Sequence, residues 1–168
     1  ELVVFTNAAL DEVFYIGVKA EDQQGGEFGL IGISSDDPFE RIVDGNPVLQ
    51  GFPVRAIIPD GTANLPGSVQ VFAIGISPNT VRRVTVTSLI THSNLGDLIG
   101  TLSHNRVSAV LNNHTLGNFT GTNFFQYNDS FFGGTIGSQH TDGPGSLEDF
   151  IGSQANGVWM LNMVDNSL

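Results

Sequence analysis

The sequence predicts an all-β protein, a jelly-roll-like antiparallel β-sandwich with an N-terminal β-hairpin extension. Two observations favour this class. Helix-forming Lys, Arg and Glu are scarce, and few windows of the 168 residues repeat apolar residues at spacings of three and four. Short apolar runs separated by Gly, Asn, Asp and Pro dominate instead, as is typical of sandwiches and barrels. No repeat of fixed period is present, which argues against solenoids and propellers.

The first part of the chain predicts a hairpin followed by a connector. Two apolar runs, Val13–Ala20 and Glu27–Ser34, flank a polar turn and read as its strands. The segment Asp36–Pro53 contains Asp-Asp-Pro, Asp-Gly-Asn-Pro and Gly-Phe-Pro, so we expect it to connect rather than to form strands. We therefore expect residues 1–53 to form a hairpin segment with a connector, and residues 54–168 to form the sandwich.

The sandwich region contains a series of short apolar runs that end in turn residues. We expect one strand within the long loop Leu116–Phe132, and a short helix at Ser146–Phe150, where Ser146 caps the turn and Glu148 and Asp149 suit the helix dipole. The other expected strands are Arg55–Ile58, Ser68–Ile76, Val81–Thr91, Asp97–Ser103, Arg106–Leu111 and Gly157–Val164.

Charge and cysteine content exclude several classes of protein. Seventeen acidic residues against six basic ones argue against nucleic acid and anionic lipid as partners, because both need clustered Lys and Arg. No stretch reaches 18 consecutive apolar residues, so we expect no membrane insertion. The lack of Cys removes disulfides, thiol catalysis and Cys-ligated zinc. Since the sequence begins with Glu1, we expect a processed product or a fragment.

Four stretches resemble one family in order and spacing. Ile58-Pro59-Asp60 is followed by ITHSNLGDL at Ile90–Leu98 and by LNNHTLGNFTGTNFFQYNDS at Leu111–Ser130. The last stretch, DGPGSLEDFIGSQANGVWMLNMVD at Asp142–Asp165, contains the most specific part, Leu147–Trp159. Together they resemble the P domain, or Homo B domain, of subtilisin-like proprotein convertases and bacterial secreted proteases. The resemblance runs from about residue 54 to the end.

The resemblance implies a secreted or cell-surface module without catalysis of its own. Such a module packs beside the catalytic domain of a protease and helps to fold or stabilise it, and some members bind calcium. Two departures stand out. Asn112–Asn118 replaces the family's Gly-Gly-x-Gly-Asp approach to its loop, and the family's last strand, after the Val-x-Asp element, is not found. A sandwich without that strand is expected to have an unpaired edge and a cleft in its core.

Candidate catalytic chemistry is weak. There is no G-x-S-x-G elbow and no H-E-x-x-H motif. His92 and Asp97 lie five residues apart and suggest a general base held by a carboxylate. We favour a strand-end His that hydrogen-bonds the backbone, because the family carries His there without catalysis. We therefore do not expect an enzyme.

Calcium is the stronger chemical candidate, because it binds six to eight oxygen ligands and the Gly-rich loops hold many Asp and Asn residues. No EF-hand loop is present, so a site would combine distant loops. The alternative is that these residues form turns, as we expect for Asp44 and Asp142 in their Asp-Gly pairs. The candidate ligands are Asp60, Asp97, Asn128 and Asp129, with Asp142 and Asp165 as further candidates.

Glycosylation and aromatic clustering give two further hypotheses. Sequons place candidate glycans on Asn113, Asn118 and Asn128 if the protein is eukaryotic and secreted. We expect alternate rings of the Phe-rich segment, and also Trp159, to fill the core rather than to form a binding platform. A carbohydrate-binding sandwich rests on analogy alone, because Tyr15, Tyr127 and Trp159 are few and dispersed. The Phe-rich segment contains Phe119, Phe124, Phe125, Phe131 and Phe132.

The alternative function is a self-assembling structural, filament or adhesive subunit that exchanges strands through the open sheet edge. Glu1–Leu10 begins with an apolar stretch that can act as a strand. If it inserts into a neighbouring subunit, the contact is heterologous and polymerises head to tail. The competing hypothesis is that this segment pairs within its own chain. The expected partners are thus the catalytic domain of a secreted protease or identical subunits.

Overall fold

The chain divides into two compact units, Glu1–Asp36 and Asp37–Leu168. The computed structural model describes residues 2–20, 25–130 and 138–166. Residues 37–53, which the sequence groups with the N-terminal segment, contribute strands to the second unit. Each unit is described by itself below.

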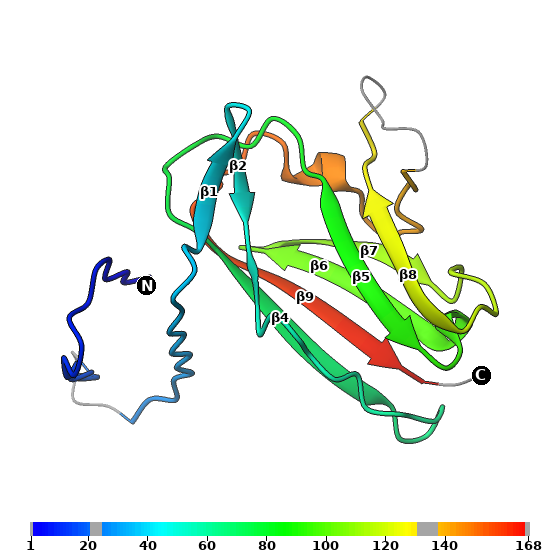
Figure 1. The fold of residues 1–168 in the computed structure, drawn as a ribbon, viewed down its shortest axis with the longest axis horizontal. Helices are drawn as coiled ribbons and strands as arrows, with labels where there is room; N and C mark the ends of the chain where they lie inside the picture. The colour runs from blue at the N-terminus through cyan, green and yellow to red at the C-terminus, as the bar shows by residue number, and fades with distance from the viewer. Residues whose placement is uncertain (1, 21–24, 131–137, 167–168) are drawn as a thin grey trace. The chain divides into compact units, whose positions relative to one another are not determined.

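The second unit is an all-β antiparallel sandwich, which confirms the predicted fold class (Figure 1). Its larger sheet has five strands in the order β3-β4-β9-β6-β7, and two-stranded sheets are formed by β5 with β8 and by β1 with β2. Every strand pairing within these sheets is antiparallel. The strands are β1 (Glu40–Val43), β2 (Asn46–Leu49), β3 (Gly51–Phe52), β4 (Gly67–Gly75), β5 (Val86–His92), β6 (Leu98–His104), β7 (Val107–Asn113), β8 (Gly121–Tyr127) and β9 (Gly157–Asp165).

The core lies between the β5–β8 sheet and the β6–β7 side of the larger sheet. In β6 every second residue is buried, which is the period-two pattern of a strand with one face on the core. Ile90 of β5 and Phe125 of β8 join the same buried cluster as Leu102 of β6 and Leu111 of β7. The predicted core position of Trp159 is also confirmed, since its side chain is 8% exposed.

The short helix predicted near residue 146 is present as the 3-10 helix η2 (Leu147–Phe150). Ser146 caps it: its Oγ accepts a hydrogen bond from the Glu148 N–H at 3.1 Å, while Asp149 Oδ2 accepts one from the Ser146 N–H at 2.8 Å. Leu147 and Phe150 are fully buried. The second 3-10 helix, η1 (Leu95–Asp97), has only three residues, and no helix in the described ranges is long and apolar enough to cross a membrane.

The hairpin predicted at Val13–Ala20 and Glu27–Ser34 is wrong for the described residues, which form no strand there. Most apolar side chains of this unit are exposed, including Val13 at 68% and Ile31 at 58%. A two-stranded hairpin is marginally stable unless it buries a face, and this one buries none. Part of its predicted turn lies outside the described residues.

The hairpin that does form is β1–β2, inside the predicted connector. Its two-residue loop is Asp44–Gly45, with φ of 49° and 78°, and positive φ at both positions suits the twist of a hairpin. The predicted Asp44 turn is therefore confirmed, but its flanking strands were missed. Glu40 connects this hairpin to the end of β4, because its carboxylate accepts hydrogen bonds from the N–H groups of Ile76 and Ser77 and from the Ser77 hydroxyl.

Two predicted strands differ from the structure. Arg55–Ile58 forms no strand, and Ile57 is 86% exposed, so nothing covers its side chain. The predicted strand Val81–Thr91 is shorter, because β5 begins only at Val86. Val81 instead forms two backbone hydrogen bonds with the loop after η2. Its N–H donates to the Ser153 carbonyl, and its carbonyl accepts from the Gly152 N–H. Tertiary hydrogen bonds have replaced the pairing that β-branched residues favour.

Candidate functional site

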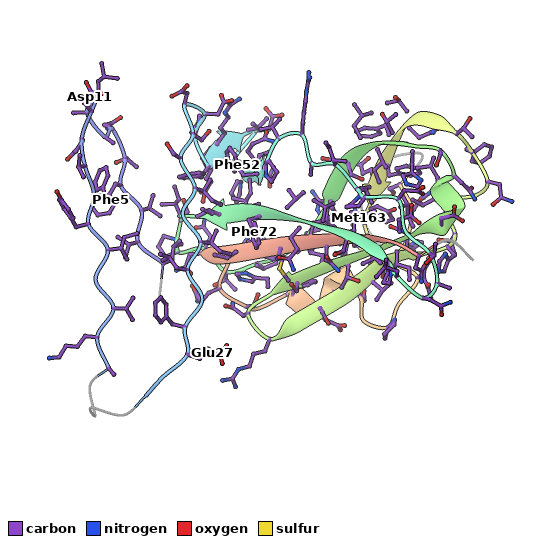
Figure 2. All side chains as sticks on the ribbon, turned by 90° about the horizontal axis from the view of Figure 1, so that it is seen from below. Phe5, Asp11, Glu27, Phe52, Phe72 and Met163 are labelled. Carbon is purple, nitrogen blue, oxygen red and sulfur yellow. The ribbon has the colours of Figure 1, made fainter. Side chains whose placement is uncertain are left out.

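A groove of about 490 Å³ with an apolar floor opens over the β4–β9 part of the large sheet. Its floor consists of two pairs of side chains that lie opposite each other in the strand register, Val69 with Met163 and Val71 with Leu161. Alternate residues of a strand point to one face, so all four side chains share the inner face of the sheet. Figure 2 labels Met163 on β9 and Phe72 on the adjacent β4. Val69, Val71 and Leu161 are half-buried, whereas Met163 belongs to the buried core cluster and forms the deepest part of the floor.

One wall of the groove is an edge of β5. Five consecutive residues, Thr87–Thr91, line it. Because successive side chains of a strand point to opposite faces, an unbroken run can line a groove only along the strand's edge. Among the described residues β5 pairs with β8 alone. Its other edge therefore presents backbone N–H and C=O groups toward the groove, where a further strand can bind them.

The opposite wall comes from the segment between β3 and β4. Its lining residues include Val54, which is 66% exposed, and Ile57. Gly51 lies close to the floor, since a Cβ at this position would meet Val71 Cγ1 at 2.7 Å. The groove therefore offers apolar side chains on the floor and one wall, and hydrogen-bonding backbone on the other wall. This combination suits an extended polypeptide whose alternate side chains are apolar.

The groove lining carries no charge, but arginines lie next to it. Arg55 lies between lining residues Val54 and Ala56, and Arg82 and Arg83 precede β5. All three arginines are exposed, and none forms an ion pair within the described ranges. Their positive charge favours a ligand that is acidic on either side of an apolar stretch.

A His–Asp pair closes the end of the groove where β5 stops. His92 Nε2 lies 3.1 Å from Asp165 Oδ2, and both side chains are buried. His92 Nδ1 lies 2.8 Å from the Asn94 carbonyl oxygen, so the predicted backbone partner is confirmed. Asp97, the carboxylate considered for a catalytic pair, instead accepts a hydrogen bond from Asn94 Nδ2 at 2.9 Å. The pair joins the two sheets.

The four predicted calcium ligands fall at two ends of the sandwich. Asp97 lies beside the end of β9, where its carbonyl accepts a hydrogen bond from Asn166, and the Gly61 that follows Asp60 packs on the Asp165 carbonyl. Asn128 and Asp129 follow β8, whose last residue pairs with Val86 at the other end of β5. Within residues 2–20, 25–130 and 138–166, no group of three or more His, Asp or Glu can hold a metal ion.

Asp129 has a dense set of protein hydrogen bonds. Its Oδ1 accepts from the Thr141 N–H at 2.8 Å, and its Oδ2 accepts from the Thr141 and Ser146 hydroxyls and the Leu147 N–H, each at 2.7 Å. Burial raises the pKa of Asp129, but these hydrogen bonds outweigh burial and hold the pKa below its ordinary value of 3.8. Asp129 thereby ties the end of β8 to the start of η2. The Asp142 carboxylate likewise accepts hydrogen bonds from the Asn113 N–H and the Thr115 hydroxyl, at and just after the end of β7.

Two of the three sequon asparagines are accessible. Asn113 and Asn118 are exposed, whereas Asn128 is 4% exposed and its Oδ1 accepts a hydrogen bond from Ser130. In the Phe-rich segment Phe125 is buried, while Phe119 and Phe124 are exposed. This confirms alternation along β8. Phe131 and Phe132 lie outside the described residues.

The residues of the groove were missed by sequence reasoning, which predicted only that a cleft exists. The signal that was present is the alternation of Val69 with Val71 and of Leu161 with Met163. Alternation shows that the residues share a face, but only the tertiary structure shows that this face lines a groove beside β5. Comparison of the chain with family models, curated proteins and solved structures finds no match.

Proposed function

We propose that the chain is a non-catalytic, secreted or cell-surface β-sandwich module that binds an extended polypeptide strand in the groove beside β5. The observation that carries the proposal is the juxtaposition of an unpaired strand edge with an apolar floor. An added strand would bond its backbone to Thr87–Thr91 and place alternate side chains on Val69, Val71, Leu161 and Met163. Main-chain hydrogen bonds supply affinity in such β-augmentation, and the side-chain pockets supply specificity.

The test is hydrogen–deuterium exchange of the full chain with a defined probe. The probe is a capped octapeptide of alternating Val and Thr with one Glu at each end. We expect the peptide to slow exchange of the β5 amides. If millimolar peptide leaves β5 exchange unchanged, the proposed function is wrong.

A matched pair of substitutions on β4 locates the binding site. Val71 lies on the groove floor, whereas the neighbouring Gln70 is exposed on the opposite face of the strand. We expect Val71→Arg to abolish the protection of β5 and Gln70→Arg to keep it. Equal protection in both variants would place the peptide elsewhere and reject the groove.

The second candidate function is that of an accessory module resembling a P domain, which stabilises the catalytic domain of a secreted protease. It is supported by the motif residues Leu147, Phe150 and Trp159, which all join one buried core cluster. A strand of the catalytic domain would then occupy the groove. Sequencing the coding region on both sides tests this candidate, which requires a subtilisin-like catalytic domain in the same polypeptide.

A further inference from the structure

The N-terminal unit contains a segment with the properties that the groove requires. In Val13–Ala20 one face of an extended chain carries Phe14, Ile16 and Val18, with Ala20 after them. Ile16 is 65% exposed and Val18 is 58% exposed. Single exposed apolar residues are ordinary, but a row of them along one face of a strand-length segment indicates a surface that another chain covers.

The length and backbone of this segment match β5. Val13–Ala20 has eight residues, and β5 has seven. At about 3.3 Å per residue, an eight-residue strand spans roughly 26 Å. The described residues 13–20 contain no positive φ, whereas Asn7 interrupts Glu1–Leu10 with a φ of 60°. The segment Val13–Ala20 is therefore better suited to a continuous strand than the first ten residues.

Charge is complementary between the segment and the surroundings of the groove. Residues 1–36 contain seven acidic residues and a single Lys, whereas all five arginines lie in residues 37–168. Asp11 and Glu12 immediately precede the segment. Arg55 lies between groove residues Val54 and Ala56, and Arg82 and Arg83 lie in the segment that leads into β5. Opposite charges at the flanks steer association and suppress wrong registers.

We infer that Val13–Ala20 of one copy binds along the free edge of β5 in a second copy, with Phe14, Ile16 and Val18 on the groove floor. The inference rests on the proposed function, since it names the strand that the groove receives. Within residues 1–36 the side chains of Ile16 and Val18 are exposed, and within residues 37–168 the groove is open. Donor and acceptor are different surfaces of the chain, so the contact is heterologous and extends head to tail.

Engineered cysteines test the contact directly, because the native chain has none. Ile16 is central in the donor segment, and Ser88 is central in β5 and lines the groove. Two single-Cys full-length variants, Ile16→Cys and Ser88→Cys, are mixed and oxidised. Adjacent strands lie within disulfide reach in either strand direction, so we expect a mixed disulfide. A Ser108→Cys variant is the matched control, because Ser108 is exposed on β7, an edge strand of the five-stranded sheet, which does not include β5.

A second measurement uses the mass of assemblies in sedimentation. We expect the unmodified chain to form concentration-dependent oligomers at tens of micromolar. Ile16→Asp should return it to a monomer, whereas Ile31→Asp, at an Ile of similar exposure in the same unit (58% against 65%), should not. Both substitutions lie outside Asp37–Leu168 and leave the sandwich core intact.

Any of three results would overturn the inference. The first is that the unmodified chain stays monomeric at every concentration. The second is that the disulfide to position 88 forms only within a single chain that carries both cysteines, and the third is that Ile31→Cys forms the disulfide in place of Ile16→Cys. If any of these occurs while the Val-Thr octapeptide still protects β5, the groove binds strands but not this one. If the octapeptide also fails, the proposed function falls with the inference.

Discussion

His92 Nε2 lies 3.1 Å from Asp165 Oδ2, and this contact joins β5 of the small sheet to the last residue of β9. The Asp165 side chain is 1% exposed. A buried carboxylate is costly unless charged or hydrogen-bonding groups surround it. The pair therefore helps to set how far the two sheets lie apart at this end of the groove.

We expect His92→Gln to lower the free energy of unfolding by about 1–3 kcal/mol, because it removes a partner of a buried carboxylate. Urea denaturation at pH 7 measures the change. His140→Gln is the control: its side chain is 78% exposed and 3.5 Å from Asp129, so we expect a change within about 0.5 kcal/mol. Equal effects of the two substitutions would contradict the role of the His92 pair.

Acid should destabilise the protein partly through Asp129 and Glu40. Burial raises the pKa of each, but hydrogen bonds lower both pKa values below their ordinary values of 3.8 and 4.5. A lowered folded-state pKa contributes stability that is fully present above the unfolded value and is lost as the pH falls through the folded value. We expect the free energy of unfolding to fall below about pH 4.5, with a shallower slope in Asp129→Asn. If the free energy of unfolding of Asp129→Asn falls with pH as steeply as that of the unmodified chain, Asp129 does not contribute to the acid sensitivity.

The role of Asp129 in calcium binding can be separated from its role in packing. Its oxygens already accept hydrogen bonds from Thr141, Ser146 and Leu147, so we expect Asp129→Asn to lower Tm by the same amount in calcium and in chelator. Thermal unfolding monitored by circular dichroism measures both. If Asp129→Asn removes a calcium-dependent rise in Tm, Asp129 is a calcium ligand.

Gly67 should tolerate no side chain. A Cβ there would lie 1.9 Å from the Pro59 carbonyl oxygen, so the backbone of one segment must move. We expect Gly67→Ala to lower the free energy of unfolding by about 3 kcal/mol. Ser68→Ala, at the next and exposed position of β4, should change it by less than about 0.5 kcal/mol. Similar denaturation midpoints for both variants would show that the chain near Pro59 yields easily.

A buried hydrogen-bond chain gives a further test. Tyr127 Oη donates to Asn112 Oδ1 at 3.2 Å, and Asn112 Nδ2 donates to the Leu98 carbonyl at 2.8 Å. Burial and the charge of Asp142 raise the pKa of Tyr127, so the hydroxyl stays protonated and remains a donor. We expect Tyr127→Phe to cost about 1–3 kcal/mol, because it leaves a buried amide oxygen without this donor.

The double variant Tyr127→Phe with Asn112→Leu completes this cycle. Replacing both partners by apolar groups removes the amide oxygen that Tyr127→Phe alone would leave without a donor, and the Leu98 carbonyl keeps its hydrogen bond from the His114 N–H. The loss should therefore be smaller than the sum of the two single losses. Additive losses in urea denaturation would show that the two side chains act independently.

Strands that bury one face along a continuous run were predictable. The expected strands at Ser68–Ile76, Asp97–Ser103 and Gly157–Val164 correspond to β4, β6 and β9 within a few residues. In β6 buried and half-buried positions alternate strictly from Leu98 to His104, as expected of a strand with one face on the core. Local pattern and tertiary burial agree there, so the pattern was sufficient.

The hairpins show where the pattern was insufficient. Val13–Ala20 has stronger strand propensity than Glu40–Leu49, yet only the second forms paired strands. Asp44–Gly45 closes a two-residue loop, and Glu40 anchors the hairpin to the N–H groups after β4. That anchor lies far along the chain, and propensity does not report it.

The sequence by itself determined the class of this protein: alternating short apolar runs, turn residues and few helix formers specify antiparallel strands. It also determined the cap of η2 and the Asp44 turn, since both depend on neighbours within a few residues. Only the tertiary structure decided the rest. The groove exists because the strand order places Val69, Val71 and Leu161, which are only half-buried, between β5 and the segment that follows β3. The pairing of His92 with Asp165 likewise depends on which strands face each other, and side-chain periodicity within a strand does not encode strand order.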